Sequence, residues 1–389
     1  MIHYGEGSTG KSKVIQTVTE AFAQKGVKYM LVKAAYTGVA ASLIDGKTTH
    51  TIASLSMNSE GTLSDESKAK MQQFWHPRRY LIIDEFSMIA KTFLAILSKN
   101  IGIGKEGAES ARPGHSFGGI DVILCGDLHQ FPPVAQSRAE SLYRPVDMAH
   151  DSIERQIGRR IYEEFTTVVI LKEQMRVTDP IWRDFLEHLR YGRVQEKHIQ
   201  MLRRLVLARA GSKSVDFQSE PWNSASLVTP RHAVRRLWNE AAARKECRES
   251  GERLYICTAE DRIGNRELTL AERYSVAARA KTEKRRKRKD LPWRIELSKG
   301  MKVLVTDNVE TDLDVTNGAR GEIVDIILHP DEPPPGDEPI VYLKYVPSYI
   351  LVKLNRTQAS QLDGLDESVI PVEIATKIKV ETEAGRVVT

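Results

Sequence analysis

One eight-residue run near the N-terminus constrains the fold more than any other feature. Residues 5–12 read Gly-Glu-Gly-Ser-Thr-Gly-Lys-Ser, which fits GxxxxGK[ST] between a short strand-like run and an amphipathic stretch. Glycines let a backbone curl so that its N–H groups face phosphate oxygens, and a helix N-terminus adds the positive end of its dipole. Such a match arises by chance in roughly one chain in a hundred of this length. The run therefore predicts a strand, a phosphate-binding loop and a helix.

The same motif assigns roles to single residues. Lys11 would reach the β- and γ-phosphates of ATP, and the Ser12 hydroxyl would be a ligand of Mg²⁺. We therefore expect ATP and Mg²⁺ as cofactors and count Lys11 among the catalytic residues. The predicted ATP-binding residues are Gly5, Gly7, Ser8, Thr9, Gly10, Lys11 and Ser12.

Two more polar motifs follow apolar runs. Residues 81–83 precede Asp84 and Glu85, and residues 121–125 precede the sequence GDLHQFPPV, which contains Gln130. Strand ends of this kind meet at the edge of an open α/β sheet where ligands bind. Asp84 is suited to hold Mg²⁺ through its water shell, and Glu85 to polarise the attacking water. Gln130 could sense the γ-phosphate; the alternative reading of both motifs is an ordinary polar turn.

The pattern of apolar residues indicates the fold class. Short apolar runs at 29–34, 80–83 and 121–125 alternate with helical patterns at 12–24 and 87–98, which predicts an α/β fold with a parallel sheet. A second α/β pattern begins near Thr167 and includes a predicted strand at 225–228. Beyond Arg294 short β runs and the turn Asn317-Gly318 predict a small antiparallel barrel. The predicted domains are residues 1–170 with a small insert near 56–76, an incomplete domain at 171–290, and a β-rich insertion at 291–389.

Composition narrows the possible partners. The formal net charge is +5, and the three cysteines form no CxxC pair. A mildly basic chain suits a polyanionic partner without proving one. No apolar run approaches the roughly 18 residues that cross a bilayer, so we expect an intracellular protein with no membrane partner. The basic run 281–289 could be a nuclear localisation patch, a phosphate-contacting loop or a solvated loop. Histidine spacing suggests no metal beyond Mg²⁺.

The three motifs GxxxxGKS, DEFSM and GDLHQFPPV, in this order, resemble the Pif-type DNA helicases, the 5′-to-3′ branch of superfamily one. Residues 35–41 (AYTGVAA) and 48–50 (TTH) resemble the motif with which that family holds single-stranded DNA phosphates. Residues 171–176 (LKEQMR) are similar to the segment that opens its second motor domain. The resemblance implies two RecA-like P-loop domains with parallel sheets and a small SH3-like β insertion in the second.

The resemblance also implies an activity and further site residues. Arg176 would reach across the cleft to ATP, and DNA would be bound by Thr37, Gly38, Thr49, His50 and Thr229. The implied protein is an ATP-dependent DNA helicase or translocase that moves 5′ to 3′ on single-stranded DNA and at forks. It would be a monomer in the nucleus or mitochondrion, acting in DNA repair, recombination or telomere maintenance.

Some family motifs have no counterpart in this sequence. They are the glutamine motif before the phosphate loop, the last DNA-contacting segment and the final arginine motif, so we expect a chain cut at both ends. Two readings stay open: an active translocase, or a catalytically impaired nucleic-acid-binding fragment. A small-molecule kinase or a GTPase is disfavoured, because the second α/β domain and the Gln130 motif would have no role there. Separation of DNA strands that requires ATP would establish the first reading, an active translocase.

Overall fold

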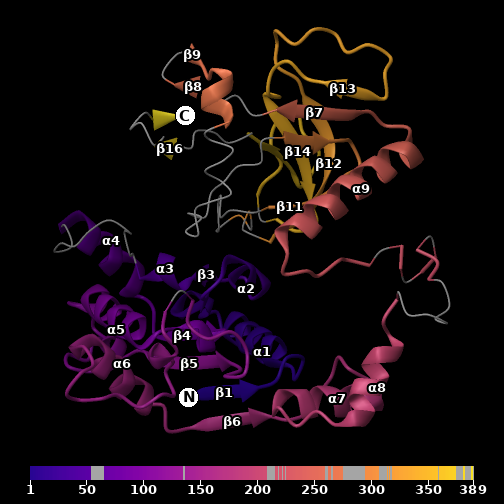
Figure 1. Cartoon of the computed structure of the whole chain (residues 1–389). Coiled ribbons are helices and arrows are strands. Elements are labelled where there is room, and N and C mark those ends of the chain that lie inside the picture. The colour runs from indigo at the N-terminus through magenta and orange to yellow at the C-terminus, as the bar shows by residue number, and fades with distance from the viewer. Residues whose placement is uncertain are drawn as a thin grey trace. The chain divides into compact units, whose positions relative to one another are not determined.

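A computed structural model shows the arrangement of helices and strands (Figure 1). It describes residues 1–53, 65–134, 136–207, 215–217, 219–220, 222–223, 225–258, 262–263, 266–274, 294–305, 313, 315, 318–357, 359–373, 380–381 and 387–388. Within these ranges the chain forms two compact units. The first comprises residues 1–216 and 306–318, and the second comprises residues 217–305 and 319–389.

The first unit is built on a six-stranded sheet. Its strand order is β3–β2–β4–β5–β1–β6, and every neighbouring pair is parallel. The apolar runs form the central strands, because a strand covered on both faces needs apolar residues pointing both ways. The bounds are β1 (Ile2–Gly5), β2 (Leu31–Ala35), β3 (Lys47–Thr48), β4 (Tyr80–Asp84), β5 (Asp121–Gly126) and β6 (Val168–Leu171).

Helices cover both faces of this sheet. In β4, Ile82 packs with helices α1 and α2 on one face, whereas Leu81 and Ile83 pack with α5 and α6 on the other. This confirms the predicted α/β fold with a parallel sheet. The helices of this unit are α1 (Lys11–Gln24), α2 (Gly38–Leu43), α3 (Thr49–Ile52), α4 (Asp65–Trp75), α5 (Lys91–Lys105), α6 (Ile153–Glu163), α7 (Pro180–Arg190) and α8 (Glu196–Arg204).

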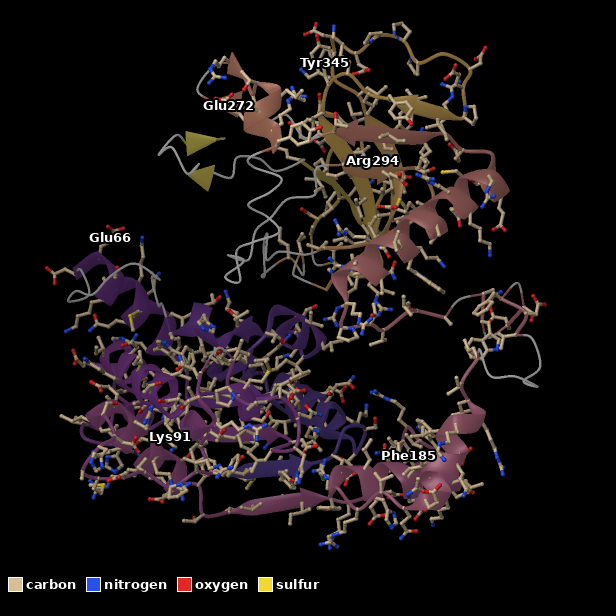
Figure 2. All side chains as sticks on the ribbon, viewed as in Figure 1. Glu66, Lys91, Phe185, Glu272, Arg294 and Tyr345 are labelled. Carbon is tan, nitrogen blue, oxygen red and sulfur yellow. The ribbon has the colours of Figure 1, made fainter. Side chains whose placement is uncertain are left out.

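Two buried lysines tie connecting segments to α5. Lys105 Nζ donates to the carbonyl oxygens of Trp75, His76 and Arg78 at 3.3, 3.1 and 2.9 Å, so it satisfies carbonyls at the C-terminal end of α4. Lys91, labelled in Figure 2, donates to the Ala139 carbonyl at 2.8 Å. Burial lowers the pKa of both ammonium groups. Each lysine therefore replaces water as the partner of buried carbonyls.

The second unit is rich in antiparallel strands. Helix α9 (His232–Ser250) precedes β7 (Leu254–Thr258), which pairs antiparallel with β10 (Arg294–Leu297) and parallel with β13 (Ile340–Tyr342). A four-stranded antiparallel sheet has the order β11–β12–β14–β15. This sheet comprises β11 (Lys302–Leu304), β12 (Arg320–Ile327), β14 (Tyr349–Leu354) and β15 (Val369–Val372). Two short antiparallel pairs are also present: β8 (Arg262–Ile263) with β9 (Arg266–Glu267), and β16 (Val380–Glu381) with β17 (Val387–Val388).

The antiparallel sheet agrees with the predicted β-rich insertion, but one predicted strand is wrong. Residues 225–228 form no strand. A strand needs a neighbour for its backbone hydrogen bonds, and none of the described strands pairs with this run. The predicted boundaries at 170 and 290 stay predictions. The basic run 281–289 and the residue Asn317 lie outside the described residues.

None of the helices in the described ranges is long and apolar enough to span a bilayer.

The contact between α5 and α6 generates a stability prediction. A Cβ on Gly158 of α6 would overlap the backbone carbonyl of Lys91, whereas a Cβ on Gly102 of α5 would lie 3.8 Å from its nearest neighbour, the Gly118 amide nitrogen. We expect Gly158→Ala to lower the free energy of unfolding by about 3 kcal/mol through overpacking. Gly102→Ala, the matched control, should be neutral or raise it by up to about 1 kcal/mol through helix propensity. Urea unfolding measures both, and equal effects would contradict the packing argument.

Candidate active site

The carboxyl ends of three adjacent strands bring the predicted motifs together. Strand β5 lies between β1 and β4 in the sheet, and all three run in the same direction. Strand β1 ends in the phosphate loop, β4 ends in Asp84, and β5 ends in the turn that contains Gln130. Three segments far apart in sequence therefore share one edge, as expected for an open parallel sheet.

The phosphate loop curls around the ammonium group of Lys11. Lys11 Nζ donates to the carbonyl oxygens of Gly5 and Glu6, both at 2.8 Å, and the residue is only 8% exposed. Gly10 precedes α1 with a φ of 90°, and Ser8 has a φ of 71°, a left-handed conformation that is unusual for a residue with a side chain. The positively charged ammonium group is thus held by carbonyls of the phosphate loop, at the start of α1. Ser12 lies exposed on the first turn of α1.

The two carboxylates after β4 lie in a desolvated environment. Asp84 is 6% exposed, and its Oδ1 accepts a hydrogen bond from the Glu85 amide at 2.9 Å. Burial raises the pKa of Asp84. Burial, and then the adjacent charge of Asp84, raises the pKa of Glu85. The buried carboxylate of Asp84 and the partly buried carboxylate of Glu85 repel one another, so a divalent cation or a proton would stabilise the pair.

Gln130 links Glu85 to the phosphate loop. With its amide nitrogen facing the carboxylate, Gln130 donates to Glu85 Oε2 at 2.6 Å and to Oε1 at 3.2 Å. The other end of the amide lies 3.7 Å from the position that a Cβ on Gly7 would take. The side chain therefore lies between the candidate base and the loop that would hold the phosphates, as a γ-phosphate sensor would.

The segment after β6 passes over the phosphate loop. Gln174 Nε2 donates to the Gly7 carbonyl, and the Met175 amide donates to the Ser8 carbonyl, each at 2.9 Å. Arg176 follows directly and is exposed. Arg176 thus lies in the same compact unit as the phosphate loop, next to Met175, whose amide contacts the loop directly.

A cavity of about 600 Å³ lies beside the phosphate loop, between Met175 and one face of α1. Its lining is mainly apolar, which suits a flat ring better than a phosphate. The lining residues are Thr9, Gly10, Lys13, Val14, Thr17, Val18 and Met175.

The predicted DNA-binding residues of the first unit follow β2 and β3. Thr37 accepts a hydrogen bond from the Ala40 amide and caps α2, whose first residue is the buried Gly38. His50 packs against the rings of Tyr36 and Phe93, with centroids 5.2 and 4.8 Å away, and burial lowers its pKa.

Two other predicted DNA contacts stand apart from these residues. Thr49 is fully buried, and its hydroxyl has no hydrogen-bond partner among the residues that the structure describes. The Thr49 side chain therefore does not reach the surface. Thr229 belongs to the second unit, where its hydroxyl accepts from the Arg231 amide just before α9.

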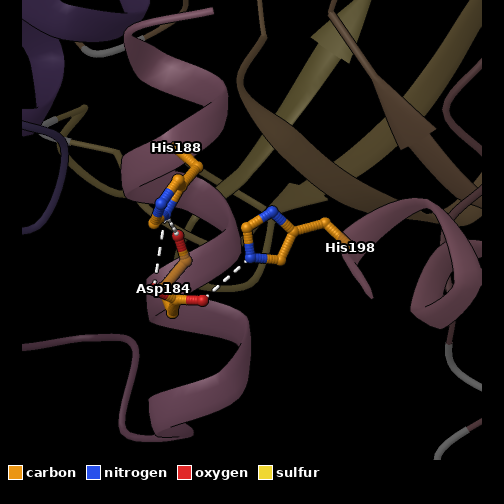
Figure 3. Close-up of side chains that lie close together, drawn as sticks. All are labelled: Asp184, His188 and His198. Carbon is orange, nitrogen blue, oxygen red and sulfur yellow. Dashed lines mark hydrogen bonds and ion pairs between the residues drawn. The ribbon is translucent and has the colours of Figure 1, made fainter. Parts of the chain in front are cut away.

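A histidine cluster joins α7 to α8 (Figure 3). Ligand atoms of Asp184, His188 and His198 lie within 4.8 Å of one another. Each is already hydrogen-bonded: His198 Nε2 to Asp184 Oδ2 at 2.8 Å, and His188 Nδ1 to the Asp184 carbonyl at 2.8 Å. Hydrogen bonds from Lys197 and His198 lower the pKa of Asp184 to about 2. The sequence did not suggest this cluster, and its hydrogen bonds account for it as a contact between two helices.

Arg190 is the site residue that sequence reasoning missed. It is the last residue of α7, and its guanidinium binds Asp127 in the turn that carries Gln130. Its local sequence gives no indication of this role, because the partner Asp127 lies 63 residues away.

Known proteins that resemble this chain include Pif1 helicases. Residues 1–188 match the family model of PIF1-like helicases. The ATP-dependent DNA helicase PIF1 of Danio rerio is 24% identical over 387 residues, covering 98% of this chain and 52% of that protein. The chain spans about half or less of the length of the curated relatives that it matches.

Two solved structures share the fold. The Pif1 helicase from Candida albicans aligns with a TM-score of 0.53 and 22% identity, covering 100% of this chain and 78% of that one. The Pif1 helicase from Bacteroides, solved in complex with ADP-AlF3 and single-stranded DNA, gives a TM-score of 0.52 and 17% identity, with coverages of 96% and 75%. Over residues 1–188, this chain is therefore similar to the PIF1-like helicases.

Proposed function

We propose that this chain contains the ATP-hydrolysing site of a DNA helicase, which couples ATP hydrolysis to movement along single-stranded DNA and to duplex unwinding. The observation that carries the proposal is the position of Gln130, hydrogen-bonded to Glu85 and adjacent to Gly7 of the phosphate loop. The names of the relatives from Emericella nidulans and Danio rerio support it, because both are called ATP-dependent DNA helicase PIF1. The ligands named for the Bacteroides structure, ADP-AlF3 and single-stranded DNA, support it as well.

The chemistry follows from the charges at the sheet edge. Lys11 would exchange the carbonyl oxygens of Gly5 and Glu6 for phosphate oxygens, which carry more negative charge. Ser12 and Asp84 offer the oxygen ligands that Mg²⁺ prefers, and the ion would neutralise charge on the phosphates. Glu85, with its raised pKa, is a better proton acceptor than an exposed glutamate, so it would polarise the attacking water.

The cavity between Met175 and α1 gives the nucleotide base a place to bind. It adjoins the loop residues Thr9 and Gly10, so a ligand could occupy the loop and the cavity together. Arg176 would then contribute positive charge at the γ-phosphate, and one arginine in this role is worth roughly 10³- to 10⁵-fold in rate.

Single-stranded DNA would bind beyond the nucleotide, near Thr37, Gly38, Thr49 and His50, with Thr229 contributing from the second unit. Because Thr49 is buried, its backbone and not its hydroxyl would face the DNA. The proposal further includes 5′-to-3′ movement and a monomeric state. It also includes a nuclear or mitochondrial location and roles in DNA repair, recombination or telomere maintenance. These further points rest on the family resemblance.

The proposed activity predicts ATP-dependent strand separation. Opening a duplex costs about 1.4 kcal/mol per base-pair step, so ten steps cost on the order of 14 kcal/mol, which single-strand binding does not readily supply. We expect the protein to separate a forked duplex with a 5′ tail only with ATP and Mg²⁺, and Lys11→Ala to abolish this. Gel-resolved strand release measures it. Equal strand release without ATP would mean that the protein binds DNA without acting as a motor. Release that occurs only with 3′-tailed forks would mean that the protein moves 3′ to 5′.

A second prediction concerns the proposed base. Glu85→Gln preserves the shape of the side chain but cannot accept a proton, so we expect nucleotide affinity within about threefold of wild type and hydrolysis at least about 100-fold slower. The matched control, Glu20→Gln on the exposed side of α1, should change neither quantity. Titration with a fluorescent ATP analogue and single-turnover hydrolysis measure the two quantities. If the Glu85 variant keeps most of its turnover, another group is the base.

A further inference from the structure

Arg190 makes one of the densest sets of polar contacts near the candidate active site. Its Nη1 donates to Asp127 Oδ2 and its Nη2 to Asp127 Oδ1, both at 2.7 Å. Nη2 also donates to the Tyr4 hydroxyl at 2.9 Å, and Nε lies 3.2 Å from Glu6 Oε1. One side chain, 11% exposed, thus contacts strand β1, the phosphate loop and the turn after β5.

The partner of Arg190 determines the shape of the turn that carries Gln130. Burial opposes ionisation of Asp127, but hydrogen bonds from Arg190 and from the His129 amide outweigh it and lower the Asp127 pKa. The Asp127 carboxylate accepts the His129 amide at 3.0 Å, and the Asp127 carbonyl accepts the Gln130 amide at 3.0 Å. Asp127 therefore fixes the turn through both its side chain and its backbone.

The contact also requires arginine in particular. Two parallel hydrogen bonds to one carboxylate need the planar fork of a guanidinium, and lysine offers only a point charge. The ion pair with Glu6 is a weaker contact, because Glu6 is 40% exposed and water screens it. Loss of the fork would therefore disturb the Gln130 turn more than the phosphate loop.

Arg190 in addition connects this turn to α7 and α8. Phe185, labelled in Figure 2, is the buried apolar residue of α7, and Asp184 on the same helix accepts hydrogen bonds from α8. Helix α7 begins at Pro180. It follows the segment that passes over the phosphate loop, which contains Gln174 and Arg176. A displacement of α7 would therefore be transmitted through Arg190 to Asp127 and then to Gln130.

We propose that Arg190 is a positioning residue that holds Gln130 against Glu85 and so couples helix α7 to the hydrolytic step. The inference rests on the proposed ATP hydrolysis. It assigns Arg190 an effect on the rate of hydrolysis with little effect on nucleotide affinity, because Lys11 and the loop amides stay in place.

The test compares Arg190→Lys with Arg183→Lys, a matched substitution at an exposed position of the same helix. Three quantities are measured: affinity for a fluorescent ATP analogue with Mg²⁺, single-turnover hydrolysis with single-stranded DNA, and melting temperature. We expect Arg190→Lys to slow hydrolysis about tenfold or more, which corresponds to about 1.4 kcal/mol, with affinity within about threefold of wild type. Arg183→Lys should leave both at the wild-type level.

A double-mutant cycle separates positioning from a merely structural role. In a Gln130→Ala background, Arg190→Lys should slow hydrolysis no further, because the group that it positions is gone. Multiplying effects, or an unchanged rate in folded Arg190→Lys, would overturn the proposal. If Arg190→Lys melts below the assay temperature, Tyr4→Phe is the second variant. It removes the hydrogen bond from Nη2 and the contact of the Tyr4 hydroxyl with His129 Nδ1, and it should slow hydrolysis about twofold, again only when Gln130 is present. An unchanged rate overturns the proposal. Wild-type protein without turnover would contradict the proposed function itself, whereas an active wild type with unaffected variants would contradict the Arg190 inference alone.

Discussion

The parallel pairing of β1 with β5, and of β5 with β4, is the constraint on which the candidate active site depends. Each strand alone ends in a polar turn that does not by itself indicate a binding site. Side by side and in one direction, the three ends place an ammonium group, two carboxylates and an amide at one edge of the sheet. Helices on both faces exclude water from the strands, and this burial is also what raises the pKa of Asp84 and Glu85.

The polar groups at this edge form hydrogen bonds with one another in the protein itself. The Lys11 ammonium donates hydrogen bonds to backbone carbonyls and forms no ion pair with a carboxylate of the described residues, so a phosphate can replace its partners without breaking an ion pair. Asp127, by contrast, is tied to Arg190 by two short hydrogen bonds. The loop that would bind the nucleotide thus keeps exchangeable contacts, while the turn that would sense hydrolysis is fixed to α7.

The sequence predicted the parts of the fold and site that depend on local patterns. Apolar runs ending in GxxxxGKS, Asp84-Glu85 and the Gln130 motif placed three strand ends correctly, because buried strands and glycine turns are encoded within a few residues. The strand predicted at 225–228 was wrong, since pairing depends on neighbours that no local run reveals. Arg190 was missed for the same reason: it lies 63 residues from Asp127, and an arginine at a helix end has no distinctive pattern.

Burial caused a further difference between expectation and structure. Thr49 stands in a motif that predicts a DNA contact, yet its side chain is fully buried while His50 beside it is not. The start of α3 turns one residue inward and the next toward an aromatic cluster with Tyr36 and Phe93. The motif predicts a DNA-contacting segment, and the fold decides which side chains in that segment can reach a ligand.

The central claim is that the three strand ends form a single nucleotide site, and the position of Lys11 tests it most directly. A crystal structure of the protein with ADP, aluminium fluoride and Mg²⁺ would show which oxygen atoms surround Lys11 Nζ. The account predicts that Nζ leaves the carbonyl oxygens of Gly5 and Glu6 for the phosphate, with Gln130 and Glu85 beside the fluoride group. A nucleotide bound elsewhere, with Lys11 still on those two carbonyls, would contradict it.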